Sequence, residues 1–136
     1  MGKTGWNGGV SRNSKVVDFS VGENGPWRLT VPQTVYPPRE DTELLAKALY
    51  SLDMAPSLAV EIGCGSGALS IILAELGWEV MAYDVNPYAV ASSRSNVEEH
   101  GLSNKVTVFE GGVGENNWSV PKEAKLLIWN LPYLEP

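Results

Sequence analysis

Residues 60–67 read Val60-Glu61-Ile62-Gly63-Cys64-Gly65-Ser66-Gly67, and this stretch decides the fold that we expect for the chain. A short apolar run, residues 58–60, leads into it, and apolar helix formers follow it over residues 68–76. The pattern predicts a strand, a tight glycine loop and a helix. Alternating glycines let the chain turn sharply, and the helix start adds the positive end of its dipole. We therefore predict a nucleotide-binding corner of an open α/β sheet.

The spacing of the glycines distinguishes two kinds of ligand. A dinucleotide fingerprint has the order G-x-G-x-x-G, whereas these glycines follow each other as G-x-G-x-G, with Glu61 two residues ahead. This order resembles the first motif of class I S-adenosylmethionine-dependent methyltransferases. The resemblance implies S-adenosyl-L-methionine as cofactor and the following binding residues: Glu61, Gly63, Cys64, Gly65 and Gly67. A nicotinamide-type dinucleotide domain and a glycine turn without a ligand are the alternatives.

The composition is typical of one globular domain. The chain has 136 residues, of which 43% are hydrophobic and 19% are charged. No apolar run reaches the length of a membrane span, and the N-terminus lacks a signal peptide's apolar core, so we expect no membrane partner. The single cysteine, Cys64, excludes an internal disulfide and fits a cytoplasmic location, and no Cys/His cluster indicates a metal.

The net charge of −6 is distributed unevenly along the chain. Residues 1–39 carry five basic and two acidic side chains, whereas residues 40–136 carry five basic and fourteen acidic ones. The acidic body argues against broad nucleic-acid binding, because neutralisation of phosphates dominates that affinity. The basic arm leaves RNA open as a partner, with a solvated tail as the alternative.

A hairpin and a helix are predicted before the glycine loop. Residues 16–21 and 27–31 read as two strands around a turn cluster. Asp41 or Thr42 is expected to cap a helix that runs to about Asp53. Its predicted apolar stripe consists of Leu44, Leu45, Ala48, Leu49 and Leu52. We divide the chain into an N-terminal arm that can include the hairpin, residues 1–35, and a core, residues 36–136.

The segment in front of the core narrows the family. The order Pro38-Arg39-x-Asp41-Thr42-Glu43 resembles the HemK-type release-factor glutamine methyltransferases. In that family the segment closes over the cofactor near the reacting centre. The resemblance implies that Arg39, Asp41, Thr42 and Glu43 shape the substrate pocket. The alternative is a capped amphipathic helix that only packs on the sheet.

Asp84 closes the next predicted strand, residues 78–83, and a helix follows from Pro87 to His100 with Val90, Ala91 and Val97 inward. An acidic residue at the end of this strand, about 20 residues past the glycines, is where a nucleoside ribose is held. A carboxylate can accept hydrogen bonds from both ribose hydroxyls. We expect Asp84, with Val85 and Asn86, to bind the cofactor, and Asn86 to cap the helix. Alternatively, Asp84 is only a cap.

Two further strands are predicted, residues 105–109 and 124–129, and the second leads into Asn130-Leu131-Pro132-Tyr133. This tetrapeptide resembles the N-P-P-Y motif of methyltransferases that act on planar amino nitrogens. The resemblance implies catalytic roles for all four residues. The side-chain carbonyl of Asn130 and the backbone carbonyl of Leu131 would accept the two N–H groups of the acceptor nitrogen, and Tyr133 would pack on the planar group.

These features together predict an α/β fold. The core is Rossmann-like, with a mostly parallel sheet and helices on both faces, and a short β-hairpin precedes it. The implied function is methyl transfer from S-adenosylmethionine to a planar amino nitrogen. A protein glutamine, as in a release factor, is favoured over adenine or guanine in RNA. The alternative is a non-enzymatic function, in which the chain is a remnant of a methyltransferase that binds a cofactor or a partner without catalysis.

The resemblance covers residues 36–133 and has four departures. Leu131 stands where the N-P-P-Y motif has its first proline, which keeps the acceptor carbonyl but loses the rigidity of the loop. Gly111-Gly112 stands where the family has an acidic residue, and Lys125 stands where it has an aspartate. The chain ends at Pro136, whereas family domains continue through about three more strands. In the family order three-two-one-four, the fourth strand would be an open edge. We therefore expect a core that is incomplete at the C-terminus and pairs with another chain or a missing C-terminal half.

Overall fold

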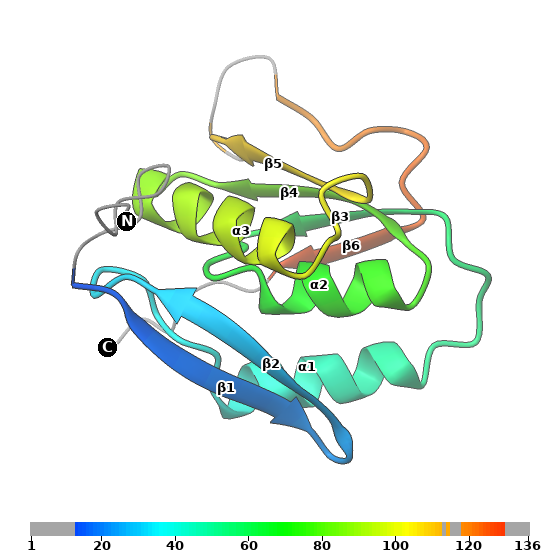
Figure 1. Ribbon diagram of the computed structural model, residues 1–136. Helices are drawn as coiled ribbons and strands as arrows, with labels where there is room; N and C mark the ends of the chain where they lie inside the picture. The colour runs from blue at the N-terminus through cyan, green and yellow to red at the C-terminus, as the bar shows by residue number, and fades with distance from the viewer. Residues whose placement is uncertain (1–12, 113, 115–117, 130–136) are drawn as a thin grey trace, which may run out of the picture.

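The computed structural model describes residues 13–112, 114 and 118–129. Within them, an antiparallel hairpin stands beside a parallel sheet that carries helices (Figure 1). The sheet consists of β3 (Leu58–Ile62), β4 (Glu79–Asp84), β5 (Val106–Glu110) and β6 (Leu126–Trp129). Their spatial order is β5-β4-β3-β6, which confirms the predicted order and the Rossmann-like fold.

Strand β3 is the centre of the sheet. Ala59 aligns with Val80 of β4 on one side and with Leu126 of β6 on the other. All residues of β3 after Leu58 are buried, as expected for a parallel strand covered on both faces. The glycine loop that follows β3 therefore emerges in the middle of the carboxyl edge of the sheet.

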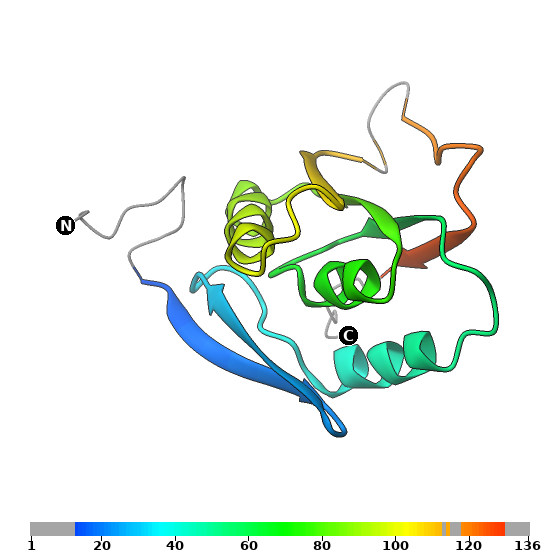
Figure 2. The same cartoon turned by 45° about the vertical axis from the view of Figure 1, so that its right-hand side comes forward.

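Helix α2 (Ala68–Glu75) is buried on almost every side. Its first seven residues are buried, because the sheet lies on one side and α1 and the hairpin lie on the other (Figure 2). A helix that is apolar all round is a buried helix. Helix α3 (Pro87–Glu99) lies next to α2 and contacts β4, β5 and β2, while α1 (Glu40–Tyr50) packs on α2 and β1.

The described helices lie on one face of the sheet, which corrects the prediction of helices on both faces (Figures 1 and 2). The chain moves sideways in one direction from β3 to β4 to β5, and right-handed crossovers then place both connecting helices on the same face. On the opposite face, Val60, Ile62 and Tyr83 form a second cluster. The loop between β5 and β6 covers it with Trp118, whose ring lies edge-on to Tyr83 at 5.2 Å.

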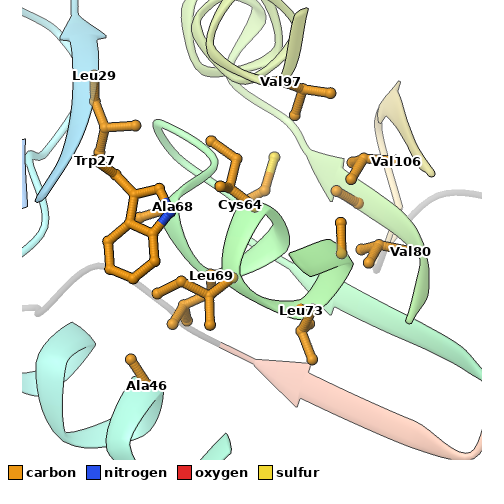
Figure 3. Packing of buried hydrophobic residues seen from close by; sticks show 14 of the residues in the cluster. Trp27, Leu29, Ala46, Cys64, Ala68, Leu69, Leu73, Val80, Val97 and Val106 are labelled. Atoms are coloured by element: carbon orange, nitrogen blue, oxygen red, sulfur yellow. The ribbon is translucent and has the colours of Figure 1, made fainter. Parts of the chain in front are cut away.

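The hairpin of β1 (Lys15–Val21) and β2 (Asn24–Val31) packs on the outside of the helices. Side chains from both strands join the main hydrophobic cluster: Phe19, Val21, Trp27, Leu29 and Val31. Figure 3 shows the Trp27 ring beside Ala68, between the hairpin and α2. Its Nε1 donates to Glu75 Oε1 at 3.1 Å. The hairpin and the helices therefore share one core.

Helix α1 differs from its prediction in its start and in its buried face. Its N-cap is Arg39, not Asp41 or Thr42, because the Thr42 hydroxyl accepts from the Arg39 N–H at 3.3 Å and closes the first turn from inside. Thr42, Ala46 and Leu49 are the buried residues. Leu44 is 67% exposed, so the buried stripe is rotated away from the predicted one, toward α2 and β1.

Replacing Trp27 with alanine tests the packing of the hairpin on the helices. Trp27→Ala removes a ring that is 6% exposed and should lower the free energy of unfolding by about 3–5 kcal/mol. Val16→Ala is the control, since Val16 of the same hairpin is 59% exposed; its effect should stay within about 0.5 kcal/mol. Chemical denaturation measures both. Similar values for the two variants would contradict the shared core.

Candidate functional site

A cavity of about 420 Å³ opens at the carboxyl ends of β3 and β4. Its wall combines the glycine loop after β3, the turn after β4, the segment before α1 with the first residues of α1, Gly111 and Trp129. The volume lies in the range of small-molecule pockets. The location is the one at which open α/β sheets bind ligands.

The glycine loop is held in a conformation that needs glycine. Gly63 and Gly65 have φ values of 78° and 56°, which residues with a Cβ rarely adopt. A Cβ on Gly65 would meet nothing within 4 Å, so the loop is open at this residue, which lines the cavity. The Gly63 and Cys64 N–H groups donate to Tyr83 O at 2.8 and 3.1 Å, which fixes the start of the loop to β4.

Asp84 links the loops that follow β3 and β4. Its Oδ2 accepts from the Gly65 N–H at 3.0 Å, and its Oδ1 accepts from the Asn86 N–H at 3.0 Å. A carboxylate has about four lone-pair sites, so both oxygens can accept further donors from the cavity. The predicted cap of α3 is confirmed: Asn86 Oδ1 accepts from the Tyr88 N–H at 2.9 Å, with Pro87 as the first helical residue.

Glu61 lies behind the glycine loop and not on the cavity wall. It is fully buried, and its Oε1 accepts from Ser70 Oγ at 2.6 Å, whereas Oε2 has no hydrogen-bond partner within the described part of the chain. Burial raises the pKa of Glu61 to about 8; the hydrogen bond from Ser70 lowers this pKa and the charge of Asp84 raises it. A buried oxygen without a partner is costly, and a cationic ligand group nearby would reduce that cost.

The segment before α1 forms the second wall. The Arg39 guanidinium lies over the Tyr36 ring, 4.7 Å from its centroid. Of the predicted substrate-pocket residues, Arg39, Asp41 and Thr42 line the cavity. Glu43 does not line it, and its Oε2 lies 3.6 Å from Lys47 Nζ. Asp41 Oδ1 accepts from the Thr42 N–H at 2.9 Å, which fixes its side chain at the helix start.

The predicted cofactor residues fall into two groups. Those on the cavity wall are Gly63, Cys64, Gly65, Asp84, Val85 and Asn86. Those off the wall are Glu61 and Gly67; Gly67 is the N-cap of α2, and a Cβ on it would come within 3.2 Å of Ser93 Oγ. The predicted catalytic residues Asn130, Leu131, Pro132 and Tyr133 lie outside the described residues.

A metal site, a membrane-spanning helix and a reactive thiolate find no support in the described part of the chain. No group of three or more His, Cys, Asp or Glu side chains there could hold a metal ion. No helix of those residues is long and apolar enough to cross a membrane. Burial raises the pKa of the Cys64 thiol well above its ordinary value, which keeps it from acting as a thiolate nucleophile.

Residues 39–131 match the family model of the ribosomal protein L11 methyltransferase (PrmA). The chain belongs to this family of S-adenosylmethionine-dependent methyltransferases. The match extends over about two thirds of the chain, from the start of α1 past the end of β6. The prediction of a class I methyltransferase is thereby confirmed.

Two individual relatives of the chain are also methyltransferases by their names. The chain is 41% identical to the ribosomal protein L11 methyltransferase of Vibrio campbellii over 69 residues, which are 50% of this chain and 23% of that protein. It is 33% identical over 108 residues to a Methanocaldococcus jannaschii protein assigned as an N5-glutamine methyltransferase, covering 79% of this chain and 51% of that protein. The matched part of the chain thus spans about a quarter of one relative's length and about half of the other's.

A solved structure shares the fold. It is described as an S-adenosyl-L-methionine-dependent methyltransferase from Methanococcus maripaludis, with a TM-score of 0.56 and 22% identity over 63% of this chain and 40% of that chain. S-adenosyl-L-methionine is the cofactor of this family. The residues fit that group on three counts: the open approach at Gly65, the spare lone pairs of Asp84, and, behind the loop, the unpartnered Glu61 oxygen, whose burial a cationic group in the cavity would make less costly.

The sequence analysis missed the polar side of α3. Ser92, Ser93 and Asn96 are buried, and the last two bond to the glycine loop. The sequence-based prediction places only the apolar residues Val90, Ala91 and Val97 of this helix inward. The signal was available, because these three residues share one helical face with Ala89 through spacings of three and four.

The Glu61 carboxyl should make the fold less stable as the pH rises. Its pKa is about 8 in the folded protein against an ordinary 4.5, so between these values the folded state holds a proton that the unfolded chain has released. The free energy of unfolding should therefore fall from about pH 4.5 to pH 8 and should not depend on this group outside that window.

Glu61→Gln removes the titration while keeping the shape of the side chain. This variant should have a shallower pH profile and should be more stable than the unaltered chain above pH 8. Glu79→Gln is the control, because Glu79 is exposed. Denaturant midpoints measured across the pH range check both, and parallel profiles for the unaltered chain and Glu61→Gln would contradict the raised pKa.

Proposed function

We propose that this chain transfers a methyl group from S-adenosyl-L-methionine to a planar amino nitrogen, with a protein glutamine amide as acceptor. The observation that carries the proposal is the place of Trp129, which ends β6 and lines the cavity. Asn130-Leu131-Pro132-Tyr133 follows it directly in the sequence. The N-P-P-Y-like motif is thus joined to a residue of the cofactor cavity. The cofactor supplies an electrophilic methyl group on a sulfonium.

In this proposal the two loops at the carboxyl edge hold the cofactor. Asp84 would accept hydrogen bonds from the ribose hydroxyls through the lone pairs that its bonds to the Gly65 and Asn86 N–H groups leave free. The negative charge of Glu61, favoured by a nearby ammonium, balances the amino-acid part of the cofactor from behind the loop. Val85, which is 65% exposed, offers an apolar surface on the same wall.

The acceptor side requires groups that orient a poor nucleophile. A planar amide nitrogen is a weak nucleophile, because its lone pair is delocalised. The Asn130 side-chain carbonyl and the Leu131 backbone carbonyl would accept hydrogen bonds from its two N–H groups and so hold the nitrogen in line with the methyl group. The same contacts would favour the positive charge that develops on the nitrogen as it attacks; the sulfonium would leave as a neutral thioether, and the methylated nitrogen would release one proton. Tyr133 would pack on the planar group, and Pro132 would restrict the backbone between Leu131 and Tyr133.

The preference for a glutamine amide has one specific support. The Methanocaldococcus relative is assigned to that acceptor, and its similarity extends over more of this chain than the similarity to the Vibrio L11 enzyme. A HemK-type assignment agrees with this relative and with Arg39, Asp41 and Thr42 on the cavity wall. RNA is the second candidate acceptor, and the excess of acidic side chains in residues 40–136 disfavours it.

The open edge of strand β6 is a surface on which another strand could pair. Within the described residues β6 pairs with β3 alone, and its Leu127 and Trp129 are 47% and 49% exposed. An open edge with apolar side chains invites another strand. We propose that a strand of another polypeptide segment pairs with β6. It would then lie beside Trp129 and contribute to the wall of the site.

Calorimetric titration tests the cofactor and the role of Asp84. The chain should bind S-adenosylmethionine or S-adenosylhomocysteine and not NAD. Asp84→Ala should weaken this binding by about 1–3 kcal/mol, because a charged acceptor of buried hydroxyls is lost. Asp18→Ala should leave it unchanged, since Asp18 pairs with Arg28 on the exposed hairpin. Binding of NAD without either adenosyl ligand would overturn the proposed cofactor.

A methyl-transfer assay tests the acceptor. A glutamine-containing release-factor peptide and an RNA pool are offered in separate reactions. On whichever acceptor is methylated, Asn130→Ala should lower turnover by about two orders of magnitude or more, with little change in cofactor affinity. Near-normal turnover would remove the amino-nitrogen proposal. If only RNA is methylated, RNA is the acceptor in place of a glutamine amide. If the chain binds the cofactor but methylates neither acceptor, a non-catalytic cofactor-binding function is favoured.

A further inference from the structure

The inner face of α3 carries polar side chains at positions where a packed helix usually has apolar ones. Ser92 and Ser93 are fully buried and Asn96 is 1% exposed. None of the three lines the cavity. Burying such groups costs free energy unless each finds hydrogen-bond partners. The partners that they find indicate why these polar groups lie inside.

Ser93 and Asn96 both bond to the glycine loop. Ser93 Oγ donates to Gly65 O at 2.7 Å, and Asn96 Nδ2 donates to Ser66 O at 2.8 Å. Two consecutive carbonyls of the loop are therefore held toward α3. Because a trans peptide points its C=O and N–H in opposite directions, the bond to Gly65 O directs the Ser66 N–H away from α3. Ser66 lines the cavity.

The Gly65 residue is held from both ends. Its N–H donates to Asp84 Oδ2 at 3.0 Å, while its carbonyl accepts from Ser93. The loop also lies close to the helix at Gly67, where a Cβ would come within 3.3 Å of the Ser93 Cα. A glycine-rich loop has high conformational freedom, so such anchors reduce the entropy that a ligand would otherwise have to remove.

We propose that Ser93 and Asn96 are positioning residues that keep the glycine loop in its cofactor-binding conformation. This inference rests on the proposed cofactor site. Neither residue lines the cavity. Both act through the backbone of Gly65 and Ser66, and Ser93 Oγ also lies 3.2 Å from Cys64 Sγ in the same loop. Their loss raises the dissociation constant of the cofactor, because part of the binding free energy is then spent on ordering the loop.

Ser92 provides a matched control on the same helix. It is as buried as Ser93, and its Oγ donates to Thr30 O of β2 at 2.8 Å instead of the loop. It also lies 3.4 Å from Asn96 Nδ2, a weak contact. Asn96 bonds to the hairpin as well as to the loop. Its Oδ1 accepts from the Thr30 N–H at 2.8 Å, and its Nδ2 donates to Thr30 O at 3.0 Å.

The experiment compares Ser93→Ala with Ser92→Ala in the full chain, by titration with S-adenosylhomocysteine and by chemical denaturation. Both variants lose one buried hydroxyl donor, so both should be destabilised to a similar degree. Only Ser93→Ala should weaken binding, by about three- to tenfold, the worth of one hydrogen bond. Asn96→Ala should weaken binding and also lower stability further, because it loses contacts to the loop and to the hairpin.

The outcomes separate this inference from the proposed function. Suppose that the unaltered chain binds the cofactor. If Ser92→Ala and Ser93→Ala then lose affinity equally, or if Ser93→Ala loses none, the positioning role alone is overturned. No binding of either adenosyl ligand by the unaltered chain overturns the proposed function and this inference with it. If Ser93→Ala loses cofactor affinity but Asn96→Ala does not, Ser93 positions the loop and Asn96 does not.

Discussion

The site depends on one constraint, the anchoring of the Gly65 backbone between Asp84 and Ser93. The amide of Gly65 reaches Asp84 at the end of β4, and its carbonyl reaches the inner face of α3. The end of β4 and the inner face of α3 therefore both bond to a single residue of the loop that follows β3. A side chain at this position would require an unfavourable positive φ, although the space for a Cβ is open. The loop is shaped by its backbone contacts and leaves its open side to a ligand.

The topology of the sheet explains why these anchors meet. Because β3 and β4 are adjacent and parallel, their carboxyl ends bring the glycine loop and Asp84 to the same edge. The right-handed connection through α2 and the next one through α3 place both helices on one face. Helix α3 then starts close to Asp84 in the chain and passes along the glycine loop on the side away from the cavity. Ser93 and Asn96 of α3 therefore bond to the loop from that side. The hairpin closes this arrangement from outside through Thr30.

The strand order followed from the family resemblance, whereas local signals made the glycine loop, the position of Asp84 at a strand end and the Asn86 cap predictable from the sequence. Each of these signals depends on residues that are adjacent in the chain, such as Asn86 followed by Pro87. The failures depend on distant contacts. The buried face of α1 is set by α2 and β1, and no property of Leu44 itself shows that it is 67% exposed. The place of Glu61 behind the loop follows from the alternation of β3, which sends Glu61 toward Ser70 on α2 and Ile62 to the other face.

The position of Glu61 also shows how stability and binding oppose each other in this loop. Burying the carboxyl beside Asp84 and leaving Oε2 without a described partner costs the folded state free energy above the ordinary pKa of a glutamate. A neutral side chain there would be more stable but could not respond to a cation. When a positively charged ligand binds on the other side of the loop, its field favours the ionised carboxylate and recovers part of that cost. The anchors from Asp84, Ser93 and Asn96 hold the loop that separates this carboxyl from the cavity, so the distance between the carboxyl and such a ligand depends on them.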